Sequence, residues 1–117
     1  MNTKLVGDKY ERIAELFLIK QGYKIIQKNY HNFIGEIDII ARDISNKKEP
    51  ITIFVEVKYR RNADKGMPFD AIDTYKQQKI RKTATVYSMQ NNLLDSSLRF
   101  DCIGILNEQI EYVKNAF

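Results

Sequence analysis

Residues 35–58 read GEIDIIARDISNKKEPITIFVEVK, and this stretch decides the fold of the chain. It holds two apolar segments on either side of a polar turn, a pattern that predicts a β-hairpin. Successive side chains of a strand point to opposite faces. Glu36 and Asp38 are therefore expected to share one face of the first strand. Ile37 and Ile39 are expected to share the other.

The second strand of this hairpin, residues 51–57, is predicted to be central and buried, because both of its faces are largely apolar. Two charged side chains, Glu56 and Lys58, mark its end. Pairing of the two strands would bring Asp38 close to Glu56 at one end of the hairpin. Partial burial of two carboxylates beside a lysine opposes folding, and a divalent metal ion would offset that cost. The stretch therefore suggests a hydrolytic metal site.

The 117 residues are expected to form one domain, residues 1–117. Hydrophobic residues make up 44% of the chain, which is enough for a core, and charged residues make up 29%, as in soluble proteins. No apolar segment approaches the ~20 residues of a membrane helix, and the start of the chain has no signal sequence. The single cysteine, Cys102, excludes an internal disulfide. These features predict a cytoplasmic protein without membrane contact.

Hydrophobic periodicity predicts helices at residues 5–21 and 69–90. Further segments are predicted as strands, at residues 23–30, from 35 onward, 51–57, 98–106 and 109–114. Residues 59–68 are predicted to form a basic loop. This order favours an α+β or α/β fold, in which helices pack on a mixed sheet of four to five strands.

The net charge of +4 favours polyanions as partners, although many small soluble proteins are mildly basic. Four basic residues are the candidates for contacts with nucleic acid: Arg60, Arg61, Lys76 and Lys79. Lys76 lies within the apolar stripe of its predicted helix, so its ammonium group either snorkels to solvent or faces the carboxylates or a phosphate. For Arg61, an ordinary solvated loop is an equally good interpretation.

The chain resembles two related groups of proteins. Asp38, followed by an apolar strand that ends in Glu56-Val57-Lys58, resembles the PD-(D/E)XK signature of metal-dependent nucleases. Nearly the whole chain resembles the YraN-type family of small bacterial proteins. The matching residues are Gly7, Glu11, Ala14, Gly22-Tyr23, Asn29-Tyr30, Gly35-Glu36-Ile37-Asp38, Phe54-Val55-Glu56-Val57-Lys58, Arg60, Lys76 and Arg99-Phe100-Asp101.

That family is described as predicted endonucleases and is similar to archaeal Holliday-junction resolvases. The resemblance implies a restriction-endonuclease-like αβββαβ core. The similarity to resolvases also implies a homodimer as one assembly.

Three glutamates need separate interpretations. Glu11 flanks the apolar stripe of the first helix, where a boundary glutamate is the ordinary interpretation, whereas the resemblance implies that it reaches the metal site. Glu15 lies further round the helix and is expected to be solvated. Glu36 is either an additional acidic group of the site or simply a polar residue at the strand start.

Asp101 has two interpretations as well. It either pairs with Arg99, two residues away on the same strand, or supports the site from behind. The single histidine, His31, is expected at the surface or against a phosphate.

The chemistry that the resemblance implies is phosphodiester hydrolysis with Mg²⁺ or Mn²⁺. Its implied ligands are Asp38, Glu56, the carbonyl of Val57 and Glu11. Lys58 would orient or deprotonate the attacking water, or stabilise charge on the phosphate. The sequence thus favours a metal-dependent endonuclease acting on DNA, with branched or flapped structures as candidate substrates. The alternative is a nuclease-like scaffold that binds nucleic acid or a protein partner without cleavage.

Overall fold

The computed structural model describes residues 3–117, with the side chains of all but residues 3–5, 65 and 71. Its elements follow in the order α1 (Thr3–Lys20), β1 (Lys24–His31), β2 (Glu36–Asp43), β3 (Ile51–Arg60), η1 (Ala63–Lys65), η2 (Pro68–Ala71), α2 (Thr74–Gln90), β4 (Ser97–Leu106) and β5 (Gln109–Val113). The strands form one mixed sheet in the order β1-β2-β3-β4-β5. This confirms the predicted α+β fold with a restriction-endonuclease-like core.

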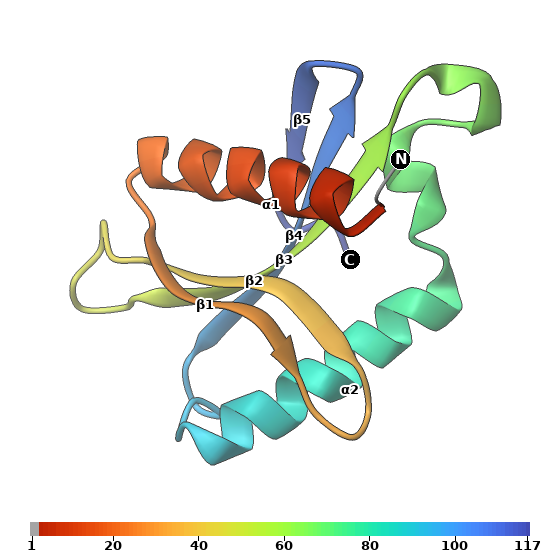
Figure 1. Ribbon diagram of the computed structural model, residues 1–117. Coiled ribbons are helices and arrows are strands. Elements are labelled where there is room, and N and C mark those ends of the chain that lie inside the picture. The colour runs from red at the N-terminus through yellow and green to blue at the C-terminus, as the bar shows by residue number, and fades with distance from the viewer. Residues whose placement is uncertain (1–2) are drawn as a thin grey trace.

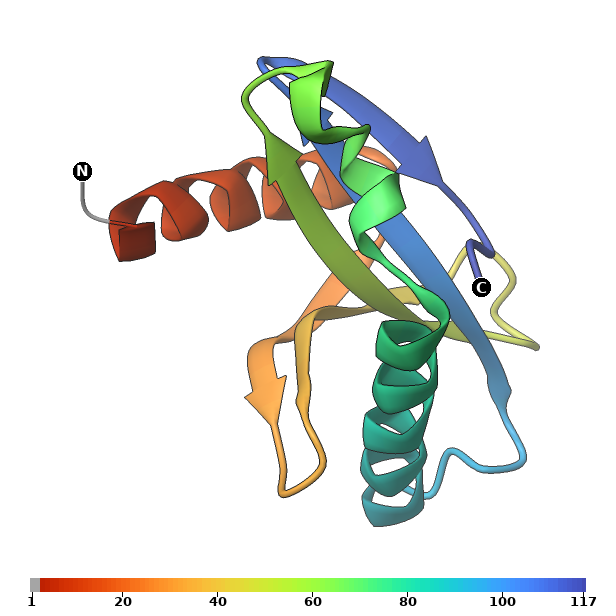
Figure 2. The same cartoon turned by 90° about the vertical axis from the view of Figure 1, so that its right-hand side faces the viewer.

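The two helices cover opposite faces of the sheet, α1 on one side and α2 on the other (Figures 1 and 2). Each helix closes a separate apolar core. The core under α1 contains Ala14, Leu18, Ile39, Ile53, Val55 and Ile103. The core under α2 contains Tyr30, Ile37, Phe54, Ile80, Tyr87 and Phe100. No helix within residues 3–117 is long and apolar enough to span a membrane.

Strand β3 is central, as predicted. It pairs antiparallel with β2 and parallel with β4, and the parallel pairing runs from Ile51 opposite Ser97 to Arg60 opposite Leu106. A parallel pair needs a crossover connection, and α2 supplies it. The strand is longer than predicted, because pairing with β4 extends it into residues 59 and 60, which the sequence assigns to the basic loop.

The second helix begins later than the predicted residue 69. Residues Pro68–Ala71 form the short helix η2, and α2 itself starts at Thr74. The Asp73 side chain accepts a hydrogen bond from the Lys76 N–H at 2.9 Å, so an aspartate cap defines the true start of the helix.

Strand β2 separates from β3 at Asp38. Pairing of the two strands stops at Ile39 opposite Val55, and the Asp38 carboxylate accepts a hydrogen bond from the Val57 N–H at 2.8 Å. Ile37 packs into the core under α2, whereas Ile39 packs into the core under α1. The prediction that these two isoleucines share a face is therefore wrong.

The neighbouring strand explains this change of face. Asn29 of β1 has a φ of 54°, in the left-handed region, and it lies between the paired positions Lys28–Ile39 and Tyr30–Ile37. Asparagine adopts this conformation more readily than most residues. Lys28 contacts α1 and Tyr30 contacts α2, so β1 changes face at the same level as β2. In both strands the regular alternation of side chains between the two faces of the sheet is interrupted at the level of Asp38, where β2 stops pairing with β3.

Arg99 and Asp101 pair with each other, which confirms the structural interpretation of the two. Arg99 Nη2 lies 2.9 Å from Asp101 Oδ2, and Asp101 is fully buried. The Tyr112 hydroxyl and the Asn115 N–H also donate to this carboxylate. Asp101 thus links β4 to β5 and to the segment that follows β5.

We expect Asp101→Asn to lower the unfolding free energy by ~3 kcal/mol, because it leaves the largely buried Arg99 guanidinium without its counter-charge. Urea denaturation of the variant and the wild type measures this difference. Asp95→Asn, at an exposed position, is the control and should change the unfolding free energy by less than ~0.5 kcal/mol. Equal stability of the two variants would contradict the structural role of Asp101.

Candidate functional site

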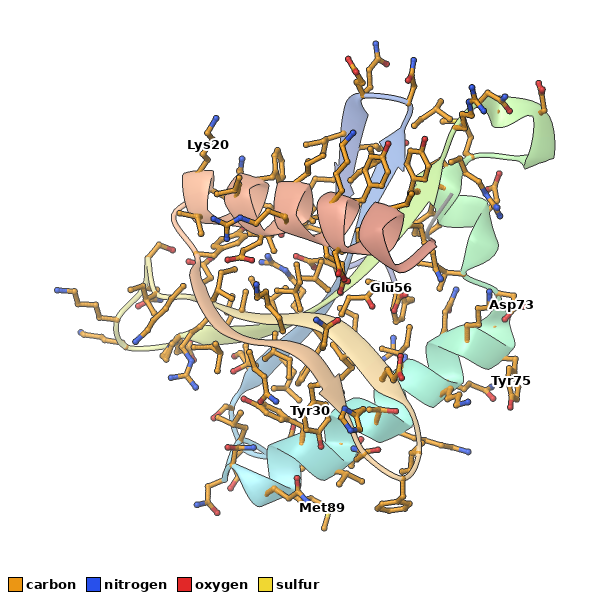
Figure 3. All side chains as sticks on the ribbon, in the orientation of Figure 1. Lys20, Tyr30, Glu56, Asp73, Tyr75 and Met89 are labelled. Carbon is orange, nitrogen blue, oxygen red and sulfur yellow. The ribbon has the colours of Figure 1, made fainter. Side chains whose placement is uncertain are left out.

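A cleft of about 390 Å³ opens between the β1–β2 turn and α2, beside the last part of β3. Figure 3 shows Glu56 between the two helices, in the middle of the molecule. Three parts of the chain line the cleft. Residues 31–36 of the β1–β2 turn form one wall, and Glu56 and Lys58 of β3 form its base. The opposite wall consists of Ile72, just before α2, and of Lys76, Lys79 and Ile80 within α2. Acidic and basic groups from distant parts of the sequence therefore share one hollow.

The turn lies directly against α2 because residue 35 has no side chain. A Cβ atom on Gly35 would lie 2.9 Å from Thr83 Oγ1 and 3.3 Å from Lys79 Cε, closer than van der Waals contact. The Asn32 amide donates to the Thr83 carbonyl at 3.2 Å and to the Tyr30 hydroxyl at 2.8 Å. These contacts bring the backbone at Gly35 close to α2 and hold one wall of the cleft in place.

Glu56 is the most perturbed acid of the site. Its side chain is only 13% exposed, and its Oε1 lies 3.4 Å from Lys58 Nζ. Burial, and after it the neighbouring Asp38 charge, raise the pKa of Glu56 to about 8, against the opposing effect of Lys58. The Lys58 ammonium therefore compensates only part of the cost of burying this carboxyl group.

Asp38 lines a second hollow, of about 260 Å³, on the α1 side of the sheet. Glu11 of α1 and Val57 of β3 line it as well, and the stacked rings of Tyr10 and Tyr59, 3.7 Å apart, form another part of its wall. Glu56 faces α2 and Asp38 faces α1. The two carboxyl groups nevertheless interact, because β2 departs from β3 at this point and leaves a gap between them.

Glu11 faces this gap rather than solvent. Its Oε1 is buried and has no hydrogen-bond partner. Burial, followed by the Asp38 charge, raises the pKa of Glu11. A buried carboxylate oxygen without a partner opposes folding, and a cation bound in this gap would offset that cost.

The donors at this site are of the chemical type that a hard divalent cation prefers. Asp38, Glu56 and Glu11 offer carboxyl oxygens. The unpartnered Glu11 oxygen and the raised pKa of Glu56 both indicate that the site lacks the positive charge that would stabilise ionised carboxylates, and a cation would supply it. Among the described side chains, no three of the His, Cys, Asp or Glu type converge closely enough to hold a metal ion. The full ligand set, including the Val57 carbonyl, stays a prediction.

The predicted basic residues fall into two places. Lys76 and Lys79 line the cleft together with Lys58, as do His31 and Glu36. Arg60 and Arg61 line a separate hollow beyond the sheet, beside Asn62 and Asp64. If these two arginines contact nucleic acid, they contact a part of it that lies outside the cleft.

Glu15 differs from its prediction as a solvated residue. It is 8% exposed, and its carboxylate lies 2.9 Å from Arg12 Nη1 and 2.8 Å from Lys28 Nζ. Lys28 belongs to β1, and the change of face at Asn29 directs it toward α1. Glu15 therefore joins α1 to the edge of the sheet, a contact that helix periodicity alone does not reveal.

Sequence reasoning also missed Phe33 and Ile34, which line the cleft from the turn. The available signal was local: an aromatic residue lies between the asparagine and the glycine of a tight turn.

A comparison with known proteins supports one assignment. The model of the uncharacterised protein family UPF0102 matches residues 10–105. A UPF0102 protein of Lachnoclostridium phytofermentans is 44% identical over 100% of this chain and 96% of its own length. A UPF0102 protein of Fusobacterium nucleatum is 40% identical over 98% of this chain and 92% of its own.

The raised pKa of Glu56 predicts how stability depends on pH. The folded protein keeps this proton up to about pH 8, whereas the unfolded chain loses it near 4.5. Folding therefore takes up a proton between these values, and the unfolding free energy falls as pH rises through the range. We expect Glu56→Gln to match the wild type near pH 4.5 and to be more stable at about pH 8, by on the order of 3 kcal/mol.

Urea denaturation across this pH range measures the effect, with Glu108→Gln at an exposed position as the control. A Glu56→Gln variant that is less stable than the wild type at high pH would show that Glu56 and Lys58 form a structural ion pair.

Proposed function

We propose that this chain, which belongs to the UPF0102 (YraN) family, is a metal-dependent endonuclease that hydrolyses phosphodiester bonds of DNA. The observation that carries the proposal is the pairing of buried Glu56 with Asp38, beside Lys58 and a lysine-lined cleft. Natural proteins accept such unfavourable charge mainly where function requires it.

The acidic groups support a site for Mg²⁺ or Mn²⁺. Asp38 and Glu56 would hold the ion, with the Val57 carbonyl and the unpartnered Glu11 oxygen as further donors. Magnesium keeps several waters and commonly takes only one or two protein carboxylates together with substrate phosphate. When bound, the ion supplies Lewis acidity toward the phosphate and the attacking water.

The Lys58 ammonium has a distinct role. Its side chain is 29% exposed, lines the cleft and lies 3.4 Å from Glu56 Oε1. From this position Nζ can donate a hydrogen bond to a phosphate oxygen or to the attacking water. Lys58 therefore stabilises the charge that grows on the phosphate during hydrolysis.

The remaining lysines of the cleft would position the substrate. Lys76 and Lys79 lie three residues apart on α2, so they project from nearly the same face of the helix. Phosphate contacts of this kind fix the register of a nucleic acid without reading its sequence. The proposed substrates are accordingly chosen by shape, such as branched or flapped DNA.

We expect cleavage of DNA with Mn²⁺ or Mg²⁺ and a loss of at least about a hundredfold in single-turnover rate for Asp38→Asn and for Glu56→Gln, since each removes a proposed ligand. Asp38→Asn should also weaken Mn²⁺ binding in calorimetry. Lys58→Ala should retain metal binding and still cleave at least about tenfold more slowly, because its contribution lies in the transition state.

The substrates for this assay are single-stranded, duplex, flap and four-way DNA, with RNA alongside, and Glu108→Gln serves as the control. If the wild type binds DNA but cleaves none of them with either ion, the chain is a nuclease-like binding scaffold. Equal Mn²⁺ binding by the wild type and Asp38→Asn would refute the ligand assignment.

The affinity for DNA should depend on salt through the lysines of the cleft. We expect a log–log slope near −0.9 for each duplex phosphate that the protein neutralises. Lys79→Ala should reduce the magnitude of that slope by roughly one, as measured by fluorescence anisotropy. Lys48→Ala, in the exposed turn between β2 and β3, is the control and should leave the slope unchanged; equal slopes for both variants would remove Lys79 from the interface.

A further inference from the structure

The tip of the β1–β2 turn presents an aromatic ring to solvent. Phe33 is 88% exposed and also lines the cleft that contains Glu56 and Lys58. A second aromatic residue, Tyr75, is 71% exposed at the start of α2 and points away from the body of the molecule in Figure 3. Folding gains little from rings with this much exposure, because the hydrophobic contribution follows the apolar area removed from water.

The two rings border one continuous surface. Tyr75 lines a hollow that adjoins the cleft, and the two hollows share Ile34 and Lys79. Lys82 also lines the hollow of Tyr75. Aromatic rings and ammonium groups therefore line both of these adjoining hollows.

The turn that carries Phe33 is held rigidly by its neighbours. Asn32 Oδ1 accepts hydrogen bonds from the N–H groups of Ile34 and Gly35 at 2.9 and 3.3 Å, and the Asn32 N–H donates to the Gly35 carbonyl at 3.0 Å. The Asn32 amide also bonds to the Thr83 carbonyl of α2. These contacts hold the backbone of the turn and leave the Phe33 ring free for a ligand. A turn that is already ordered loses less conformational entropy when a ligand binds.

A surface of this composition matches one class of ligand. Lysines contact phosphates, and exposed rings offer a face on which nucleobases stack. Inside an intact duplex each base is stacked on both of its neighbours, so only the terminal base pairs leave a free face for a protein ring. A stacking ring beside a phosphate-binding cleft therefore favours nucleic acid in which at least one base is unpaired.

We propose that Phe33 is a stacking residue for an unpaired nucleobase next to the phosphate bound in the cleft, and that Tyr75 borders the path of the same strand. This inference rests on the proposed function, which it deepens by naming the substrate class: nucleic acid with unpaired bases, rather than fully paired duplex.

Binding without cleavage tests this inference separately from the enzymatic proposal. Fluorescence anisotropy at low ionic strength with EDTA measures the affinity of the full chain for single-stranded DNA, single-stranded RNA and a blunt DNA duplex. We expect Phe33→Ala to weaken single-strand binding about tenfold, within the range known for loss of one stacked base, and to change duplex affinity by less than about twofold.

Two further substitutions of Phe33 separate stacking from simple apolar contact. Phe33→Trp should retain the wild-type affinity for single strands, whereas Phe33→Leu should lose it as Phe33→Ala does, because leucine has no π face. Met89→Ala is the matched control: Met89 is 59% exposed and lies at the far end of α2 from Tyr75 (Figure 3). Its affinities should equal those of the wild type.

Several results would overturn the inference. Phe33→Leu with full affinity would show an apolar contact, as for a protein partner, and an equal loss on single strands and duplex would show a general effect on the surface. If the wild type cleaves DNA and Phe33→Ala binds single strands normally, the stacking role fails while the enzyme stands. If Phe33-dependent single-strand binding occurs without any cleavage, the stacking role stands and the enzyme fails. Absence of binding to every strand overturns the stacking role, and the cleavage assay with Mn²⁺ or Mg²⁺ then decides the enzymatic proposal.

Discussion

The hydrogen bond from the Val57 N–H to the Asp38 carboxylate is the interaction on which the site depends. It forms where β2 leaves β3, and the side chain there replaces a main-chain partner that the ladder no longer supplies. A buried N–H without a partner would oppose folding, so this bond allows the strands to diverge. The divergence opens the gap in which Asp38 meets Glu56, and it lets Glu11 approach the same gap from α1.

The acidic groups of the site lower the stability of the fold. Glu56 is buried beside a like charge, and Glu11 keeps a buried oxygen without a hydrogen-bond partner. Asp101 in the core differs, because its carboxylate has Arg99, Tyr112 and a main-chain donor as partners. The contrast between a fully compensated acid in the core and poorly compensated acids in the gap supports the proposal that the gap binds a cation.

Much of this architecture could be predicted from local patterns in the sequence. The apolar periodicity of the two helices and the central strand β3 both depend on residues close together in the chain. The same holds for the acidic and basic end of β3, since Glu56 and Lys58 interrupt an apolar segment. The resemblance to nucleases added Glu11, which periodicity alone assigns to an ordinary helix boundary.

Only the tertiary structure decided how these pieces meet. The change of face at Asp38 coincides with the left-handed residue Asn29 on the neighbouring strand. The contact of Lys28 with Glu15 depends on that change, because strict alternation would direct Lys28 away from α1. The parallel pairing of β3 with β4 and the docking of the turn on α2 likewise join segments far apart in the sequence. The sequence by itself determined which residues carry charge and which faces are apolar, since these are local properties. The structure decided which charges share a cleft and that Phe33 borders it, because long-range strand pairing and helix packing set those distances.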